Sequence, residues 1–303
     1  MTAVIAMDLG AHDLKLVQFE EGRLTRHASV PLSDPGFIDG IPTPELAVAL
    51  KRALQSGGFT APAARVAIPD SGVAVRDFPL PAVARRDLRS AVTFEGRRLV
   101  PMSASDVYYA WHATRTSYGY GVYLVAARRE MVDAITTLIG GAGLRVERMD
   151  LKPLALARGA DLRDGLVLEW NATEATLVWM VAGRPRFFRT FVLDDEAADV
   201  DAQFDELVLS VNALVKFMRT AEPDVAIGPA THLVLCGRFA SIDQGMDRAR
   251  ERFEFAVAAP VQQIPCPPDF PWQEHLAELG LLRPLRWHER LTPSPGGDNR
   301  VAA

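Results

Sequence analysis

Residues 5–24, IAMDLGAHDLKLVQFEEGRL, decide the fold of this chain. An apolar run ends at Asp8, residues 10–13 make a tight polar turn, and a second apolar run follows over residues 14–19. Residues 21–22, Glu-Gly, then form a two-residue turn of the kind that joins antiparallel strands. The stretch predicts three consecutive strands, with a carboxylate at the mouth of the first hairpin.

That hairpin mouth has the chemistry of a site for phosphate and metal. The Asp8 carboxylate at the strand end can hold a hydrated Mg²⁺ ion. Gly10 lets the backbone approach an anion, so that backbone N–H groups face phosphate oxygens. The arrangement resembles the first phosphate-binding hairpin of ATPases of the actin, Hsp70 and hexokinase type. An ordinary hairpin with an acidic residue at its mouth is the alternative for this stretch alone.

Composition and charge limit the possible classes of protein. The chain has 303 residues, enough for about two domains, and its 49% hydrophobic and 23% charged residues fit a globular protein with a large core. A net charge of −5 argues against nucleic acid as a partner. We find no apolar run of the roughly 18 residues that a membrane span needs and no signal-peptide pattern. Cys236 and Cys266 make neither a disulfide framework nor a metal site, so we expect a cytosolic protein.

Periodicity and turn residues predict alternating strands and helices in the first half. The expected strands cover residues 64–70, 73–81, 106–113, 119–128 and 145–150, and the expected helices cover residues 44–56, 87–100, 129–141 and 153–159. The helix at residue 44 has a clear start, because Thr43 can cap it and Pro44 suits the first helical position.

The second half begins with a pattern that repeats the start of the first half. Residues 165–193 again predict strand, turn, strand, a two-residue turn at Gly183 and a third strand. A repeated three-strand unit indicates internal duplication. The elements expected after it are an amphipathic helix over residues 200–218, a buried strand running into a glycine turn within residues 231–242, and helices over residues 243–253 and 270–285.

The order of these elements resembles the PilM family of type IV pilus assembly proteins, which is similar to FtsA. The resemblance covers roughly residues 3–285. Four blocks carry it: MDLGAHDLKLVQF from residue 7, RVAIPDSGVAVRDFPLP from residue 65, VYLVAARREMVDAITTLIGGAGLRVERMDLKPLALARG from residue 122, and LVLCGRFASI from residue 233.

The resemblance implies an α/β fold of the actin-like, ribonuclease H-type kind, duplicated into two lobes, with an inserted FtsA/PilM-type subdomain. Residues 1–163 would form the first lobe, interrupted by the inserted subdomain at about residues 32–128. Residues 164–290 would form a second, shortened lobe, because only DDEAAD links Leu193 to the helix at residue 200. Residues 291–303 have the composition of a disordered tail.

The resemblance also implies a scaffold rather than an enzyme. PilM binds the short N-terminal cytoplasmic tail of the inner-membrane protein PilN, extended in a groove between the first lobe and the inserted subdomain. We therefore expect a cytoplasmic protein, not itself transmembrane, that lies at the inner membrane through a PilN-like partner. Arg85, Arg89 and Arg97 would rim that groove, and a solvated helix face is the alternative reading for them. Whether the machine is a pilus or a related secretion system stays open.

A nucleotide, by resemblance, would lie at three loops. The candidate cofactor-binding residues are Asp8, Gly10, Ala11, His12, Asp13 and Lys15 in the first hairpin, Asn171 and Thr173 in the second, and Gly237 in the adenosine turn. Asp8 would hold the metal if Mg·ATP binds.

Two of these loops depart from the family pattern. The second loop, usually Asp-x-Gly-x-x-x-Thr, has Glu169 and Asn171 in place of the aspartate and glycine. The longer carboxylate is misplaced for Mg²⁺, and a Cβ stands where the backbone must approach phosphate. In the adenosine turn, Arg238 replaces the second glycine. We expect no catalytic residue, no ATP hydrolysis, and either no cofactor or weakly bound Mg·ATP.

Two other classes of function stay open. The first is an active ATPase or sugar-kinase-like enzyme with the actin-like fold, and the altered loops argue against it. The second is an FtsA-like membrane-associated filament protein. That class needs an amphipathic C-terminal helix, and residues 286–303 offer no continuous apolar face.

Overall fold

The computed structural model describes residues 3–171, 174–193, 200–221, 227–241 and 245–284. The chain divides into two compact units, and the division falls between Leu151 and Lys152. Each unit contains a five-stranded sheet, and the first unit holds a further three-stranded sheet.

The five-stranded sheet of the first unit has the order β10-β6-β1-β2-β3. Its strands are β1 (Val4–Leu9), β2 (Asp13–Glu20), β3 (Arg23–Pro31), β6 (Ala63–Ile68) and β10 (Arg145–Leu151). β1 pairs antiparallel with β2 and parallel with β6, and β6 pairs parallel with β10. Helix α1 (Pro44–Ser56) contacts β2 and β3, and helix α3 (Arg129–Gly141) contacts β10 and the short hairpin of β4 (Phe37–Ile38) and β5 (Ile41–Pro42).

The start of α1 follows the sequence closely. The hydroxyl of Thr43 accepts a hydrogen bond from the backbone N–H of Leu46 at 3.4 Å, and Pro44 occupies the first turn. Leu46 and Leu50 lie fully buried on the inner face. The predicted cap and apolar stripe are confirmed.

The three-stranded sheet, with the order β7-β9-β8, forms the inserted subdomain. It consists of β7 (Val73–Pro81), β8 (Val107–Thr116), β9 (Gly119–Arg128) and helix α2 (Leu88–Leu99). The predicted start of this insertion at residue 32 is wrong. β6 pairs with β1 and β10, and α1 packs on β2 and β3, so residues 44–68 belong to the larger sheet. The insertion begins with β7.

The two faces of the three-stranded sheet have different neighbours. One face carries Phe78, Val122 and Leu124, which form a buried cluster with Leu88 and Val92 of α2. Because successive side chains along a strand alternate between faces, α2 covers that face alone.

The opposite face turns toward α3. There the Tyr108 hydroxyl donates a hydrogen bond to the Asp133 carboxylate at 3.0 Å. The Arg129 guanidinium lies 4.2 Å from the centroid of the Tyr108 ring. The arginines of α2 therefore belong to a different surface from the one that faces α3.

The sheet of the second unit has the order β13-β12-β11-β14-β15. Its strands are β11 (Gly165–Trp170), β12 (Glu174–Val181), β13 (Arg184–Val192), β14 (His232–Cys236) and β15 (Ala256–Ala258). Its helices are α4 (Lys152–Ala160), α5 (Val200–Ala221), α6 (Gly245–Arg252) and α7 (Leu276–Leu282), with 3₁₀ turns η1 (Arg238–Ser241) and η2 (Trp272–His275).

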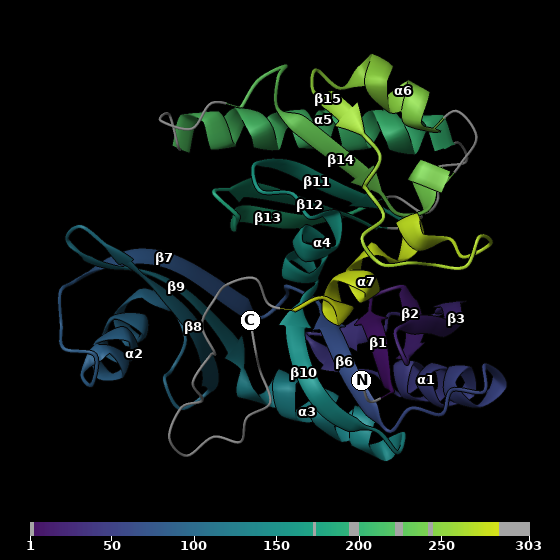
Figure 1. Ribbon diagram of the computed structural model, residues 1–303, viewed down its shortest axis with the longest axis horizontal. Coiled ribbons are helices and arrows are strands. Elements are labelled where there is room, and N and C mark those ends of the chain that lie inside the picture. The colour runs from purple at the N-terminus through teal and green to yellow at the C-terminus, as the bar shows by residue number, and fades with distance from the viewer. Residues whose placement is uncertain (1–2, 172–173, 194–199, 222–226, 242–244, 285–303) are drawn as a thin grey trace. The chain divides into compact units, whose positions relative to one another are not determined.

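Helix α5 lies along one face of this sheet, and α4 lies against the other (Figure 1). The predicted amphipathic pattern accounts for α5. Its buried residues are Phe204, Leu207, Val208, Val211, Leu214, Val215 and Met218, and all of them join the core of the sheet. The predicted link DDEAAD lies outside the described residues, as do residues 291–303.

The two five-stranded sheets share one topology, which confirms the predicted duplication. β11 pairs antiparallel with β12 and parallel with β14, as β1 does with β2 and β6. The two-residue turns that join the second and third strands of each repeat also have matching backbone angles. Glu21 and Gly22 have φ of 50° and 84°, and Ala182 and Gly183 have φ of 52° and 78°.

Two elements differ from the prediction. The predicted helix over residues 270–285 is a 3₁₀ turn, η2, followed by the short helix α7. Helix α4 falls in the second unit, although the sequence placed residues 153–159 in the first lobe. The reason is its packing on α7, where a Cβ on Gly159 would stand 2.2 Å from the Leu276 carbonyl oxygen.

Candidate functional site

The first hairpin mouth brings most of the predicted residues together. Asp8, near the end of β1, is fully buried. The backbone N–H of Gly10 donates to the Asp13 carbonyl at 2.9 Å and closes the turn. A Cβ on Gly10 would stand 2.3 Å from Asp13 Oδ1. The Asp13 carboxylate thus fills the space that the missing side chain of Gly10 leaves.

The charge at this mouth is balanced by a lysine. Lys15 lies opposite Asp8 in the register of β1 and β2, so both side chains stand on one face of the sheet. Its ammonium lies 3.6 Å from Asp13 Oδ2, and the side chain is buried. The carbonyls of Ala11 and His12 accept hydrogen bonds from the N–H groups of the following loop, at residues 36 and 32. Hydrogen bonds from the segment after β3 therefore hold this turn in place.

The second hairpin mouth repeats this geometry with different side chains. The backbone N–H of Asn171 donates to the Glu174 carbonyl at 2.9 Å, as Gly10 does to Asp13. Glu169 is buried and holds the position of Asp8. The Cβ of Asn171 fits at this position, where the first repeat has glycine. Thr173, a predicted cofactor-binding residue, lies outside the described residues.

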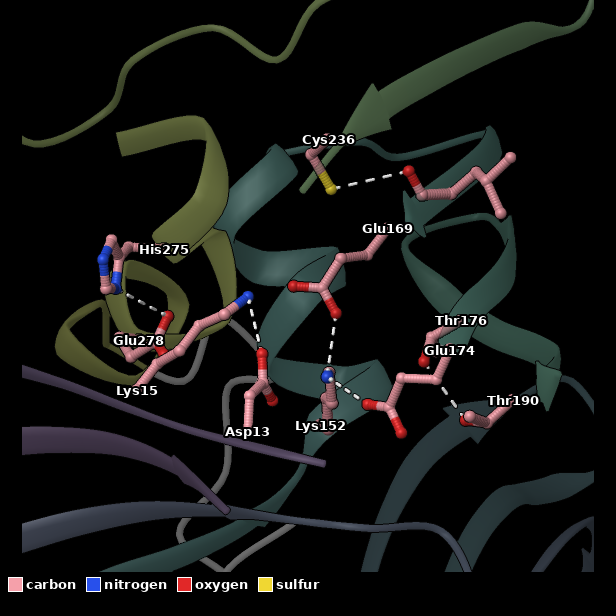
Figure 2. A network of polar contacts seen from close by, with 11 residues as sticks. Asp13, Lys15, Lys152, Glu169, Glu174, Thr176, Thr190, Cys236, His275 and Glu278 are labelled. Atoms are coloured by element: carbon pink, nitrogen blue, oxygen red, sulfur yellow. Dashed lines mark hydrogen bonds and ion pairs between the residues drawn. The ribbon is translucent and has the colours of Figure 1, made fainter. Parts of the chain in front are cut away.

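Lys152 occupies the centre of this second mouth. Its ammonium lies 2.9 Å from Glu169 Oε2 and 3.1 Å from Glu174 Oε1 (Figure 2). All three side chains are at least nine-tenths buried. Lys152 and Glu174 were not among the site residues predicted from the sequence. Two signals were available: Lys152 is one of only four lysines in the chain, and Glu174 holds the repeat position of Asp13.

The predicted adenosine turn, at Gly237, packs directly against the second hairpin. Gly237 has φ of 85°, and a Cβ there would stand 2.4 Å from the Trp170 carbonyl oxygen. Its N–H donates to the Gln273 carbonyl at 2.9 Å. Arg238 is exposed, and the next residue, Phe239, stacks on Trp170 with ring centroids 3.9 Å apart. The glycine is therefore required by the packing of β14 on β11.

The predicted partner residues lie on or beside α2. Arg85 and Arg97 are exposed and Arg89 is half-buried. Burial raises the pKa of Tyr109 above its ordinary value, and the nearby Arg97 guanidinium lowers it in part. Since α2 covers the face of the sheet that turns away from α3, these arginines lie on the α2 side of the inserted subdomain, and their role in binding a partner stays a prediction.

Among the described residues, no group of three or more histidine, cysteine, aspartate or glutamate side chains could hold a metal ion. Nor does any described helix have the length and apolar character needed to cross a membrane.

The sequence matches a family model described as type IV pilus assembly protein PilM over residues 6–181, more than half of the chain. The chain belongs to the PilM family. The matched region of this family runs from the first hairpin through the inserted subdomain to the end of β12. No curated protein matches the chain in sequence.

Solved structures share the fold of this PilM-family chain. A structure titled "PilM-PilN type IV pilus biogenesis complex" has a TM-score of 0.72 at 20% identity, covering 92% of this chain and 97% of that one. The cytoplasmic domain of EpsL, an inner-membrane component of the type II secretion system of Vibrio cholerae, has a TM-score of 0.55 at 13% identity, with 94% and 98% covered. The ethanolamine utilization protein EutJ from Carboxydothermus hydrogenoformans has a TM-score of 0.50 at 12% identity, with 93% and 89% covered. The fold is therefore actin-like, as predicted.

Proposed function

We propose that this chain is a cytoplasmic scaffold of a type IV pilus assembly platform that binds the N-terminal cytoplasmic tail of a PilN-like inner-membrane protein. The observation that supports this most is the likeness to the PilM-PilN complex, with a TM-score of 0.72 over 92% of the chain, joined to membership of the PilM family. Binding to the membrane partner would hold the chain at the inner membrane.

We place the tail along β7, in an extended conformation. β7 is an edge strand of its sheet, the position at which an extended peptide can add as a further strand. Val73 and Val75 are half-buried and lie on the face opposite the cluster with α2, where apolar side chains of a tail can pack. A short extended peptide buries little area, so we expect a micromolar dissociation constant.

The test is a titration of the full chain with a synthetic peptide of the cytoplasmic tail of the membrane protein encoded beside it. Val75→Glu should weaken binding at least tenfold, because it sets a charge in an apolar contact. Phe94→Ser, at an exposed position on α2, is the matched control and should leave binding unchanged. If Phe94→Ser and Arg97→Glu abolish binding while Val75→Glu does not, the α2 surface is the site. If the wild-type chain binds no such tail, the scaffold proposal fails.

We further propose that nucleotide is dispensable for this role. Support comes from Glu169, Asn171 and Arg238, each of which departs from the residue expected in a nucleotide loop. Calorimetry of the purified chain with Mg·ATP should show no stoichiometric binding below the high-micromolar range. A dissociation constant of about 1 μM, or roughly −8 kcal/mol, would overturn this part and leave the partner proposal standing.

A further inference from the structure

We propose that Lys152 is a built-in counterion that takes the place of a divalent cation at the second hairpin. The inference extends the proposal that nucleotide is dispensable, and it does not depend on the proposal that the chain binds a PilN-like tail. Mg²⁺ therefore does not fit this mouth, although the actin-like fold implies it.

The geometry makes the lysine and a metal ion mutually exclusive. The Lys152 ammonium lies within hydrogen-bond distance of one oxygen of Glu169 and one of Glu174. A divalent cation bridging these carboxylates would need the same space and oxygen ligands at about 2.0–2.6 Å. It would also add charge beside a buried ammonium, and two cations in a site shielded from water repel each other strongly.

Burial holds the ammonium in this position. Side-chain exposure is 5% for Lys152, 2% for Glu169 and 9% for Glu174. A buried carboxylate without a partner is costly, so withdrawal of the lysine would leave two like charges uncompensated. Lys152 is also the first residue of α4, whose residues are all buried, so its backbone is fixed by packing.

Comparison of the two repeats shows why a lysine from outside the hairpin is needed. In the first repeat Lys15, inside the hairpin, forms an ion pair with Asp13 and lies opposite Asp8 in the strand register. The same position in the second repeat is Thr176, whose hydroxyl lies 3.1 Å from that of Thr190.

The second hairpin thus has two carboxylates and no cation of its own. Lys152, the first residue of α4, supplies a positive charge between these two carboxylates. The lysine accompanies an altered second loop, in which Glu169 replaces aspartate and Asn171 replaces glycine.

The experiment removes the ammonium and asks whether a metal replaces it. Wild type, Lys152→Met and the control Lys51→Met, at an exposed position on α1, are titrated with Mn²⁺ without nucleotide. Binding is followed by electron paramagnetic resonance and by thermal unfolding.

Wild type and Lys51→Met should bind no Mn²⁺ and show no shift in Tm. Lys152→Met should melt at lower temperature, bind Mn²⁺ stoichiometrically, and recover part of the lost Tm when Mn²⁺ is added. Adding Glu169→Gln to Lys152→Met should abolish the Mn²⁺ response.

Stoichiometric Mn²⁺ binding by the wild-type chain would overturn the inference, as would a Lys152→Met variant that folds with unchanged Tm and no metal response. If Lys152→Met does not fold, Lys152→Met/Glu169→Gln/Glu174→Gln removes all three charges and should fold again. A failure of this neutral variant would show that the lysine acts through packing, not charge, and would also overturn the inference.

Discussion

Gly280 of α7 approaches Ala155 of α4 so closely that a Cβ on Gly280 would stand 1.8 Å from the Ala155 carbonyl oxygen. At the same crossing Arg158 donates a hydrogen bond to the Gly280 carbonyl at 3.2 Å. The position of α4, which carries Lys152, therefore depends on a glycine far along the chain.

Gly280→Ala should lower the free energy of unfolding by about 1–3 kcal/mol or more, because α4 and α7 would have to separate. The measurement is denaturant unfolding followed by circular dichroism. Gly140→Ala on α3 is the matched control, since a Cβ there meets nothing within 4 Å and alanine favours the helix. Equal stability of the Gly280→Ala and wild-type chains would contradict the close crossing.

Gln18 ties β2 to the loop before β6. Its Oε1 accepts hydrogen bonds from the N–H groups of Thr60 at 2.8 Å and Ala61 at 3.0 Å, and the side chain is fully buried. Gln18→Met should cost about 1–3 kcal/mol, because both donors lose their acceptor. Gln55→Met, at an exposed position on α1, should change stability little. A loss no larger than that of the control would show that water satisfies the two donors.

Asp8→Ala should lower the Tm in the absence of any nucleotide. Asp8 is fully buried and stands opposite Lys15, so its removal leaves that lysine with less counter-charge, at about 1–3 kcal/mol. Differential scanning calorimetry of the nucleotide-free chain measures the change, with Asp34→Ala at an exposed loop position as control. A Tm that changes only when Mg·ATP is present would instead indicate a working nucleotide site.

The thiol of Cys266 should react slowly with iodoacetamide near neutral pH. Burial raises the pKa of this thiol above its ordinary value, although a hydrogen bond with Gln262 lowers it in part. A raised pKa leaves less thiolate at a given pH, so the rate should rise at higher pH than in the unfolded chain. Mass spectrometry of Cys236→Ser protein across a pH series measures it. Equal rates for folded and unfolded protein at neutral pH would contradict the prediction.

The sequence alone predicted the elements whose signals are local. Alternation of apolar residues and the two-residue turns at Gly22 and Gly183 indicated the three-strand repeats, and a helical stripe indicated α5. Thr43 and Pro44 indicated the start of α1. These features depend on residues a few positions apart, which is the range over which periodicity and turn chemistry act.

Tertiary structure alone decided which distant segments meet. The pairing of β6 with β1 and β10 removed residues 44–68 from the inserted subdomain, and the packing of α2 set its arginines on one particular face of a sheet.

The Lys152–Glu174 contact spans 22 positions, and it forms because β11, β12 and α4 converge. An ion pair of this kind leaves no periodic trace in the sequence. Its partners are selected by the burial of charge in a folded core, where each carboxylate must find a cation close in space.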